Sequence, residues 1–238
     1  MYSAGAVKTR FDDRIITMRA LIFDLDGTLV DTVYAHVFAW QLTLEEAGMP
    51  QDGWRIHRRI GMSGGLFTRA LAREVGRPLT PDETRFLQNR HGELFRKLLQ
   101  RRRPLPGALT LLQRLRDLGV PHGIATSGSR PDIDASLEAL RVPAGMVVVN
   151  REDVSHAKPA PDLFLACQER LGVPPEECYV VGDAVWDLLA ARRARMLGIG
   201  LLTGGYGQDE LLGAGAYQVY RDAEELDQAL GELGVIPD

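Results

Sequence analysis

The sequence predicts an α/β protein, in which a doubly wound parallel sheet carries an inserted helical segment. Residues 20–23 form an apolar run without polar alternation, which is typical of a central parallel strand buried on both faces. From residue 105 onward helix and strand patterns alternate, which implies a parallel sheet with right-handed crossovers. Residues 32–104 contain no convincing strand pattern. We therefore expect a Rossmann-like core from residues 1–31 and 105–238, and a helical domain from residues 32–104.

Three helices are predicted within the inserted segment. Apolar residues recur at steps of three and four over 33–47 and give the first helix one apolar face. A turn of small residues at 60–65 opens a second helix, which runs to about Gly76. The third begins at Thr80-Pro81-Asp82-Glu83, a capping-box pattern with proline in the first turn, and ends near residues 101–103.

The remainder of the chain is predicted to alternate between helices and strands. Helices are expected at about 107–118, 131–140, 162–171, 185–197 and 223–233, and strands at 123–126, 146–149, 179–181, 198–202 and 217–220. Open α/β sheets bind their ligands at the carboxyl ends of parallel strands, so polar residues that follow these strands are the candidate site residues.

The composition restricts the class of protein. Hydrophobic residues make up 45% and charged residues 25% of the 238 residues, which is the profile of a globular protein. The net charge of -4 argues against nucleic acid or an anionic membrane as the main partner. No apolar run approaches the ~18 residues that span a bilayer, and residues 1–18 lack the apolar centre of a secretory signal. Cys167 and Cys178 are expected to be packed thiols. A cytoplasmic enzyme fits these features best.

Two acidic residues follow the first strand. Asp24 and Asp26 are two positions apart, so they start out on the same side of the strand as it ends. Two partly buried carboxylates at this spacing need a proton or a cation to offset their repulsion. The sequence therefore predicts a metal at this edge of the sheet.

Hydroxyls and a lysine follow two further strands. Thr126 and Ser127 either form an anion site with free backbone N–H groups at a helix start, or cap that helix. Lys158 begins the stretch KPAPD, in which two prolines stiffen the backbone. Most lysines are solvated surface residues, but rigid flanks suit a side chain that must hold a fixed position.

A further strand ends at Asp183, and Asp187 follows four residues later. Acids at a helix start are often solvated residues that favour the helix dipole. The apolar strand before them and Trp186 beside them favour a buried acidic cluster instead. Together with the first acidic pair, these residues offer the oxygen ligands that Mg²⁺ prefers: Asp24, Asp26, Asp183 and Asp187.

These motifs resemble, in order and in position, the haloacid dehalogenase (HAD) superfamily, in its phosphatase type with a helical cap. They are DLDGTLVDT at 24–32, Thr126, KPAPD at 158–162 and GDAVWD at 182–187, and the resemblance spans about residues 19–220. It implies an enzyme that hydrolyses a small phosphorylated metabolite, such as a sugar phosphate or phosphoglycolate. Residues 32–104 would be the cap that closes over the site and selects the substrate.

The resemblance also implies a role for each site residue. Asp24 would be the nucleophile that forms an aspartyl-phosphate, and Asp26 the general acid and then general base. The Asp24 side chain, the Asp26 carbonyl and Asp183 would hold Mg²⁺, assisted by Asp187. Thr126 and the Ser127 backbone would bind phosphoryl oxygens, while Lys158 orients and neutralises the phosphate.

Three alternatives stay open on the sequence alone. Halide-removing relatives lack the second aspartate, so Asp26 disfavours that activity. A phosphosugar mutase of the beta-phosphoglucomutase type is closer, because His36 stands where those enzymes carry a cap histidine that contacts the substrate region. Gly64 replaces the basic residue that such a mutase needs for a second phosphate. The third alternative is a non-catalytic binding module on the same fold; the filled catalytic positions argue against it.

Other polar features receive a structural interpretation. His57, His91, His122 and His156 have no ligand spacing and are expected to be surface or capping residues. The stretch 204–207 contains three glycines but no P-loop lysine, and a plain loop is predicted there. The oligomeric state is not predicted.

Overall fold

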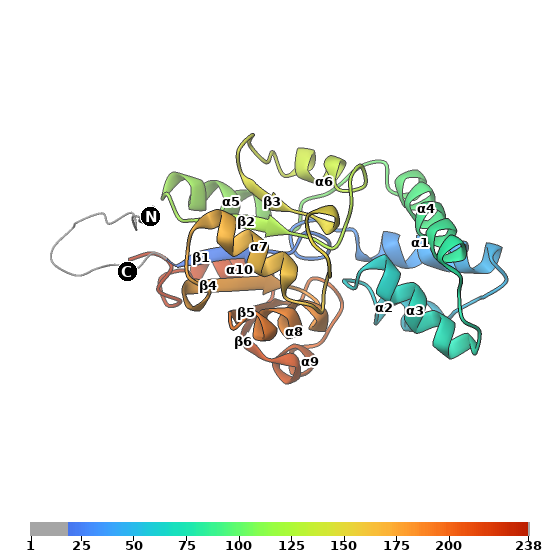
Figure 1. Cartoon of the computed structure of the whole chain (residues 1–238). Coiled ribbons are helices and arrows are strands. Elements are labelled where there is room, and N and C mark those ends of the chain that lie inside the picture. Colours follow the sequence, from blue (N-terminus) through green and yellow to red (C-terminus); the bar gives the residue numbers. More distant parts are fainter. Residues whose placement is uncertain (1–18, 238) are drawn as a thin grey trace, which may run out of the picture.

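The computed structural model describes residues 19–237, and its core is a parallel six-stranded sheet with helices on both faces (Figure 1). The strand order is β3-β2-β1-β4-β5-β6, and every neighbouring pair runs parallel. The strands are β1 (Ala20–Phe23), β2 (His122–Ala125), β3 (Val147–Val149), β4 (Cys178–Gly182), β5 (Leu197–Leu201) and β6 (Ala216–Tyr220). The fold class predicted from the sequence is therefore confirmed.

The alternating side chains of β1 divide the core into two hydrophobic clusters. Leu21 and Phe23 pack with α5 and α10 on one face, while Ala20 and Ile22 pack with α7 and α8 on the other. The helices of the core are α5 (Ala108–Asp117), α6 (Asp134–Ala139), α7 (Asp162–Leu171), α8 (Val185–Arg193), α9 (Gln208–Ala214) and α10 (Ala223–Gln228). Because neighbouring side chains of a strand point to opposite faces, a strand covered on both sides requires the uninterrupted apolar run.

Four helices form the inserted segment to one side of the sheet (Figure 1). They are α1 (Val33–Glu46), α2 (Gly53–His57), α3 (Gly64–Val75) and α4 (Pro81–Leu98). They share a hydrophobic cluster of their own, in which Trp40 and Phe67 are buried. The chain enters and leaves the segment side by side, since Val30 and Pro104 form an antiparallel bridge. The domain boundaries at 31/32 and 104/105 stay a prediction.

The structure differs from the prediction in several elements. Helices α2 and α9 were missed, because five and seven residues are too few for a helical period to show in the sequence. Helix α8 ends at Arg193 rather than at 197, because Arg195 takes a left-handed φ of 60° that no helix continues. Helix α6 begins at Asp134 rather than at 131. Two 3₁₀ turns, η1 (Arg151–Asp153) and η2 (Pro175–Glu177), complete the elements.

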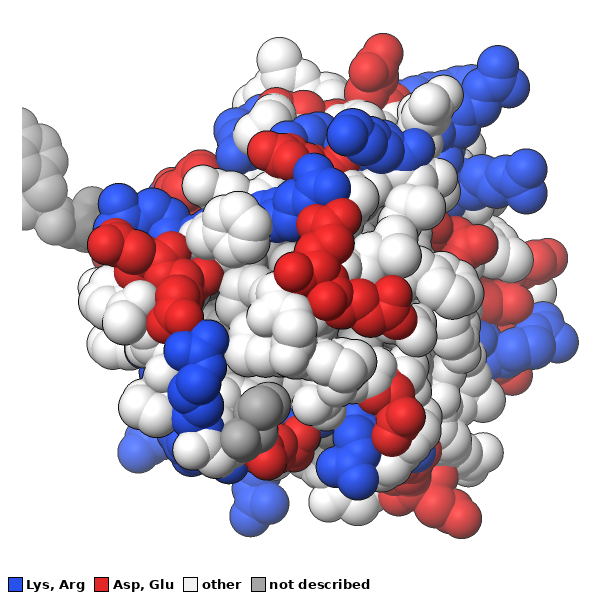
Figure 2. Space-filling model, turned by 90° about the vertical axis from the view of Figure 1, so that its right-hand side faces the viewer, with Lys and Arg blue, Asp and Glu red and all other residues white. Residues whose placement is uncertain are grey.

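Charged side chains of both signs are interspersed over the face of the molecule drawn in Figure 2. Between residues 19 and 237, no helix combines the length and the apolar character that crossing a membrane requires. Residues 1–18, for which the sequence predicts no secretory signal, lie outside the described residues.

Candidate active site

The predicted site residues meet at the carboxyl edge of the central strands. Asp24 follows β1, Thr126 follows β2, and Asp183 follows β4, and β1 lies between the other two strands. Lys158 comes from the loop that precedes α7, and Asp187 from the first turn of α8. All five side chains are buried. Neighbouring parallel strands thus bring together residues that are up to 163 positions apart, from Asp24 to Asp187.

Three carboxylates and one ammonium group form the centre of this site. Asp24, Asp183 and Asp187 each have an oxygen within 4.8 Å of the others. Lys158 Nζ ion-pairs with Asp24 and lies 2.9 Å from Asp187 Oδ1. Burial raises the pKa of Asp183 well above its usual value, and the charges of Asp187 and Asp24 raise it further. The ionised group carries a net charge of about -2, which one divalent cation would balance.

The backbone around the acidic cluster leaves room only for glycine. A Cβ on Gly204 would lie 1.7 Å from Asp183 Oδ2, and one on Gly27 would lie 2.5 Å from the same atom. Thr28 Oγ1 donates a hydrogen bond to the other oxygen, Asp183 Oδ1, at 2.7 Å. Asp183 is therefore held in place from both sides. A cluster of buried carboxylate oxygens of this kind fits a hard cation such as Mg²⁺.

Lys158 owes its charged state to the same acids. Burial by itself would lower the pKa of a lysine, but the charges of Asp187 and Asp24 overcome this and raise it. For Asp24, by contrast, burial raises the pKa, and the positive charge of Lys158 opposes that rise. The pair places a buried cation directly beside the carboxylate that the sequence predicts to be the nucleophile.

The side chain of Asp26 turns away from this cluster. Its Oδ1 accepts a hydrogen bond from Thr32 Oγ1 at 2.7 Å and lies 3.5 Å from His36 Nε2. Burial raises the pKa of Asp26, but hydrogen bonds from His36 and Thr32 outweigh it and leave the pKa below its ordinary value. Of the four predicted metal ligands, the structure thus clusters three by their side chains, and the Asp26 carbonyl stays a prediction.

The hydroxyls after β2 do not cap a helix. Thr126 Oγ1 accepts a hydrogen bond from the Gly128 N–H at 3.0 Å, which leaves its own proton free to be donated. Ser127 Oγ donates to the Gly61 carbonyl of the inserted segment at 3.1 Å. Because α6 begins only at Asp134, the capping alternative for Thr126 and Ser127 is wrong.

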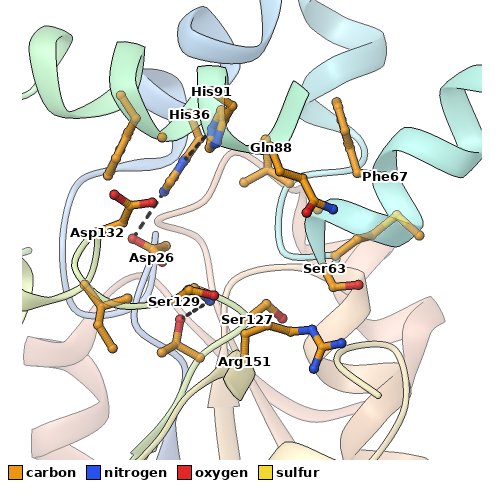
Figure 3. A pocket seen from close by; sticks show the side chains of 18 of the residues that line it. Asp26, His36, Ser63, Phe67, Gln88, His91, Ser127, Ser129, Asp132 and Arg151 are labelled. Carbon is orange, nitrogen blue, oxygen red and sulfur yellow. Dashed lines mark hydrogen bonds and ion pairs between the residues drawn. The ribbon is translucent and has the colours of Figure 1, made fainter. Parts of the chain in front are cut away.

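A cavity of about 760 Å³ opens above these residues, between the core and the inserted helices (Figure 3). Asp24, Asp26 and Thr126 line it from the core. From the inserted helices it is lined by His36, Trp40, Phe67, Gln88 and His91, and Figure 3 shows Gln88 pointing into it. The acidic centre therefore adjoins a space of the size that small-molecule ligands occupy.

The surface interpretation of His57 and His91 is wrong. His91 lines the cavity and lies 3.2 Å from His36 Nδ1 through its Nε2 atom. His57 Nε2 lies 2.8 Å from the Gly204 carbonyl, so it connects α2 to the loop beside Asp183. The spacing of Gln88, His91 and Phe95 on α4 was a signal that one helix face carries polar and aromatic residues together.

The chain matches a family model for haloacid dehalogenase-like hydrolases over residues 18–195. It belongs to this family. Hexitol phosphatase A of Escherichia coli is 33% identical over 178 residues, which cover 74% of this chain and 79% of that protein. Phosphoglycolate phosphatase of Escherichia coli is 30% identical over 243 residues, 93% of this chain and 94% of that protein. A crystal structure of a hydrolase from Pseudomonas syringae superposes with a TM-score of 0.88 at 45% identity, covering 91% of this chain and 99% of that one. The predicted family and the predicted class of enzyme, a hydrolase of the HAD type, are confirmed.

Proposed function

We propose that the protein is a Mg²⁺-dependent phosphatase that hydrolyses a small phosphorylated metabolite through an aspartyl-phosphate on Asp24. The observation that carries this proposal is the buried ion pair of Asp24 with Lys158, surrounded by Asp183 and Asp187, at the floor of the cavity. A phosphate dianion enters an acidic site only if cations cancel the repulsion. Two cations would do so here, namely the Lys158 ammonium group and a Mg²⁺ ion held by the carboxylates.

The residues that would hold Mg²⁺ are the Asp24 and Asp183 side chains and the Asp26 carbonyl, with Asp187 in support. When bound, the ion supplies positive charge that attracts and polarises the phosphoryl group. Lys158, held between Asp24 and Asp187, supplies the second positive charge and orients a phosphoryl oxygen. The Thr126 hydroxyl and the Ser127 backbone N–H would bind the remaining oxygens.

The reaction follows from the positions of Asp24 and Asp26. A carboxylate oxygen of Asp24 attacks phosphorus, the bond from phosphorus to the ester oxygen breaks, and the departing oxygen takes its proton from Asp26. Water then attacks the aspartyl-phosphate and gives its proton back to Asp26. Inorganic phosphate leaves, Asp24 is again a free carboxylate, and Asp26 again carries the proton with which it began.

One position in the cavity favours a substrate with one phosphate group. Five arginines line the cavity, and three of them pair with acids: Arg59 with Glu74, Arg96 with Asp132 and Arg130 with Asp134, whereas Arg69 and Arg151 have no acid partner among the described residues. Gly64 provides no cation, and Gln88 packs beside it. A mutase of the beta-phosphoglucomutase type must hold a second phosphate, so the lack of a cation at position 64 favours the phosphatase. His36, which lines the cavity from α1, would also contact the substrate.

The relatives support the same reaction, since hexitol phosphatase A and phosphoglycolate phosphatase are named for phosphate esters of small molecules. The partner we propose is accordingly a small phosphorylated metabolite.

The test is phosphate release from a panel of phosphorylated metabolites, with and without Mg²⁺. We expect release that stops with EDTA, and none from Asp24→Asn, whose thermal unfolding curve should still show a folded protein. Equal activity of wild type and Asp24→Asn would refute the assignment. Interconversion of sugar-phosphate isomers that depends on a bisphosphate, without phosphate release, would establish the mutase instead.

A further inference from the structure

Two histidines from different helices form a chain that ends at Asp26. His36 on α1 has Nε2 at 3.5 Å from Asp26 Oδ1 and Nδ1 at 3.2 Å from His91 Nε2 on α4. Figure 3 shows His36 between the other two side chains. The residues are 55 positions apart in sequence, and the packing of α1 on α4 brings them together.

Stacking fixes the plane of the His36 ring, but it does not fix which face of the ring lies against Phe95. Phe95 stacks on His36 with ring centroids 3.8 Å apart and planes inclined by 8°. The stacking contact is nearly as stable after the His36 ring turns over by 180°, because it involves the face of the ring and not one particular ring atom. The turned ring would present a C–H group to Asp26 in place of Nε2.

The contact with His91 distinguishes the two orientations. It joins His36 Nδ1 to a nitrogen and would be lost if the ring turned over. His91 is itself held by stacking on Trp40, with centroids 4.3 Å apart and planes inclined by 15°. Burial lowers the pKa of His91 well below its usual value, so His91 is neutral. A neutral imidazole has one N–H and one lone pair, so His91 can donate a hydrogen bond to Nδ1 of a His36 ring that carries its own proton on Nε2, toward Asp26.

The two carboxylate oxygens of Asp26 have different surroundings. Thr32 and His36 both lie against Oδ1. No described residue donates a hydrogen bond to Oδ2, which lies on the side of Gly128, where a Cβ would be 3.7 Å from it. Oδ2 is the oxygen left to exchange a proton with the ester oxygen or with water.

We propose that His91 is a positioning residue, which holds the His36 ring with Nε2 toward Asp26 and so aims Asp26 Oδ2 at the leaving group. This inference rests on the proposed phosphatase reaction. It extends the site by one residue that touches neither the phosphate nor the acidic cluster.

The variants are His91→Phe, which keeps an aromatic ring against Trp40 but has no ring nitrogen, and His91→Gln, whose amide keeps a donor near the position of Nε2. Phe67→Leu is the control, because Phe67 also packs on Trp40, with ring centroids 4.3 Å apart, and forms no ring pair with a histidine among the described residues. The substrates are phenyl phosphate and 4-nitrophenyl phosphate, which match in shape. The phenyl ester leaves as the stronger base and needs the proton from Asp26.

We expect His91→Phe to lower kcat/KM for phenyl phosphate about tenfold, a part of the roughly 10²–10⁴-fold that general acid catalysis supplies. The loss for 4-nitrophenyl phosphate should stay below about twofold, His91→Gln should recover most activity, and Phe67→Leu should affect both substrates alike. Equal losses on both esters in His91→Phe, without recovery in His91→Gln, would show that His91 only packs.

A second measurement does not depend on activity. Ring nitrogen NMR spectra of the wild type should show two unequal nitrogens for His36, assigned by their loss in His36→Asn. They should move toward one average in His91→Phe, because a ring that turns over takes Nε2 away from Asp26 and its proton is then no longer held on that nitrogen, and they should stay apart in His91→Gln. If the wild type releases no phosphate from any ester, the proposed function fails, and these spectra still decide on His91. Identical His36 signals in wild type and His91→Phe would overturn the inference.

Discussion

Removing one acid from the centre of the site should stabilise the protein when no metal is present. In Asp183→Asn the amide oxygen still accepts the hydrogen bond that Thr28 donates to Oδ1 at 2.7 Å. The amide nitrogen takes the place of Oδ2, and the negative charge that repels Asp24 and Asp187 is removed. The change keeps the shape of the side chain and removes one buried charge, so packing is preserved.

The magnitude follows from the distances in the cluster. At the 4.8 Å limit for these oxygens, and with an effective dielectric constant of ~20, two carboxylates repel by roughly 3.5 kcal/mol. Attraction to Lys158 and partial protonation of the cluster offset much of this. We expect a net gain of about 1–3 kcal/mol for the metal-free variant, a trade of activity for stability that active-site acids often show.

Thermal unfolding in EDTA and in MgCl₂ measures this directly. For a chain of this length, each kcal/mol shifts Tm by about 2–4 °C. Mg²⁺ at 100 times its Kd should stabilise the wild type by about 2.7 kcal/mol and the variant much less. Glu138→Gln, which removes an exposed acid on α6, is the control and should behave as the wild type. A variant that is less stable than wild type in EDTA, or equally stabilised by Mg²⁺, would contradict the cluster as a cation site.

Three further predictions concern the rest of the fold. Tyr206→Phe removes the 3.0 Å hydrogen bond to the Arg58 carbonyl, which joins the core to the inserted helices, and should cost about 1 kcal/mol of unfolding free energy, read as a lower Tm. Gly107→Ala should cost several kcal/mol of unfolding free energy, because a Cβ would lie 2.1 Å from a backbone nitrogen of α10. Gly119→Ala should cost only roughly 1–2 kcal/mol, because the residue has a φ of +67° but open space around it. Urea unfolding of the two variants measures the difference. The pKa of Glu83 falls from 4.5 to about 2, chiefly because its carboxylate accepts a hydrogen bond from the Thr80 backbone N–H at the start of α4. Its contribution to folding stability is therefore complete above pH 4.5 and is lost as the pH falls toward 2. The Tm difference between wild type and Glu83→Gln should shrink over that range, and a difference independent of pH would contradict this.

The sheet and the acidic cluster were predictable because their signals are local. The two strands that lead to the acidic cluster each consist of an apolar run followed directly by an aspartate, at Phe23–Asp24 and Gly182–Asp183. Parallel pairing then brings these ends to one edge without any further information. The capping box at Thr80 is equally local, and the structure contains both of its hydrogen bonds. Short helices such as α2 and α9 carry too few residues for such a signal.

The histidine pair was not predictable in the same way. His36 was noted only for its position after the aspartate motif, and His91 was expected at the surface. Their contact depends on how α1 packs against α4, which no spacing within either helix records. The same is true of His57 and Gly204, which meet across 147 positions between the inserted segment and the core.

The direction of the Asp26 side chain depends both on the local sequence after β1 and on how the inserted segment packs. Its position after β1 is local, and that alone made it a candidate metal ligand beside Asp24. Its carboxylate nevertheless turns toward Thr32 and His36, because the chain entering the inserted segment supplies donors on that side. The main chain of Asp26 follows β1 at the edge where Asp24 lies, while its side chain lines the cavity that the inserted helices complete. The Asp26 carboxylate therefore lies outside the acidic cluster, and its pKa is below its ordinary value, whereas burial and neighbouring charges raise the pKa of Asp183. The inserted helices therefore determine the surroundings of the Asp26 carboxylate as well as part of the cavity lining.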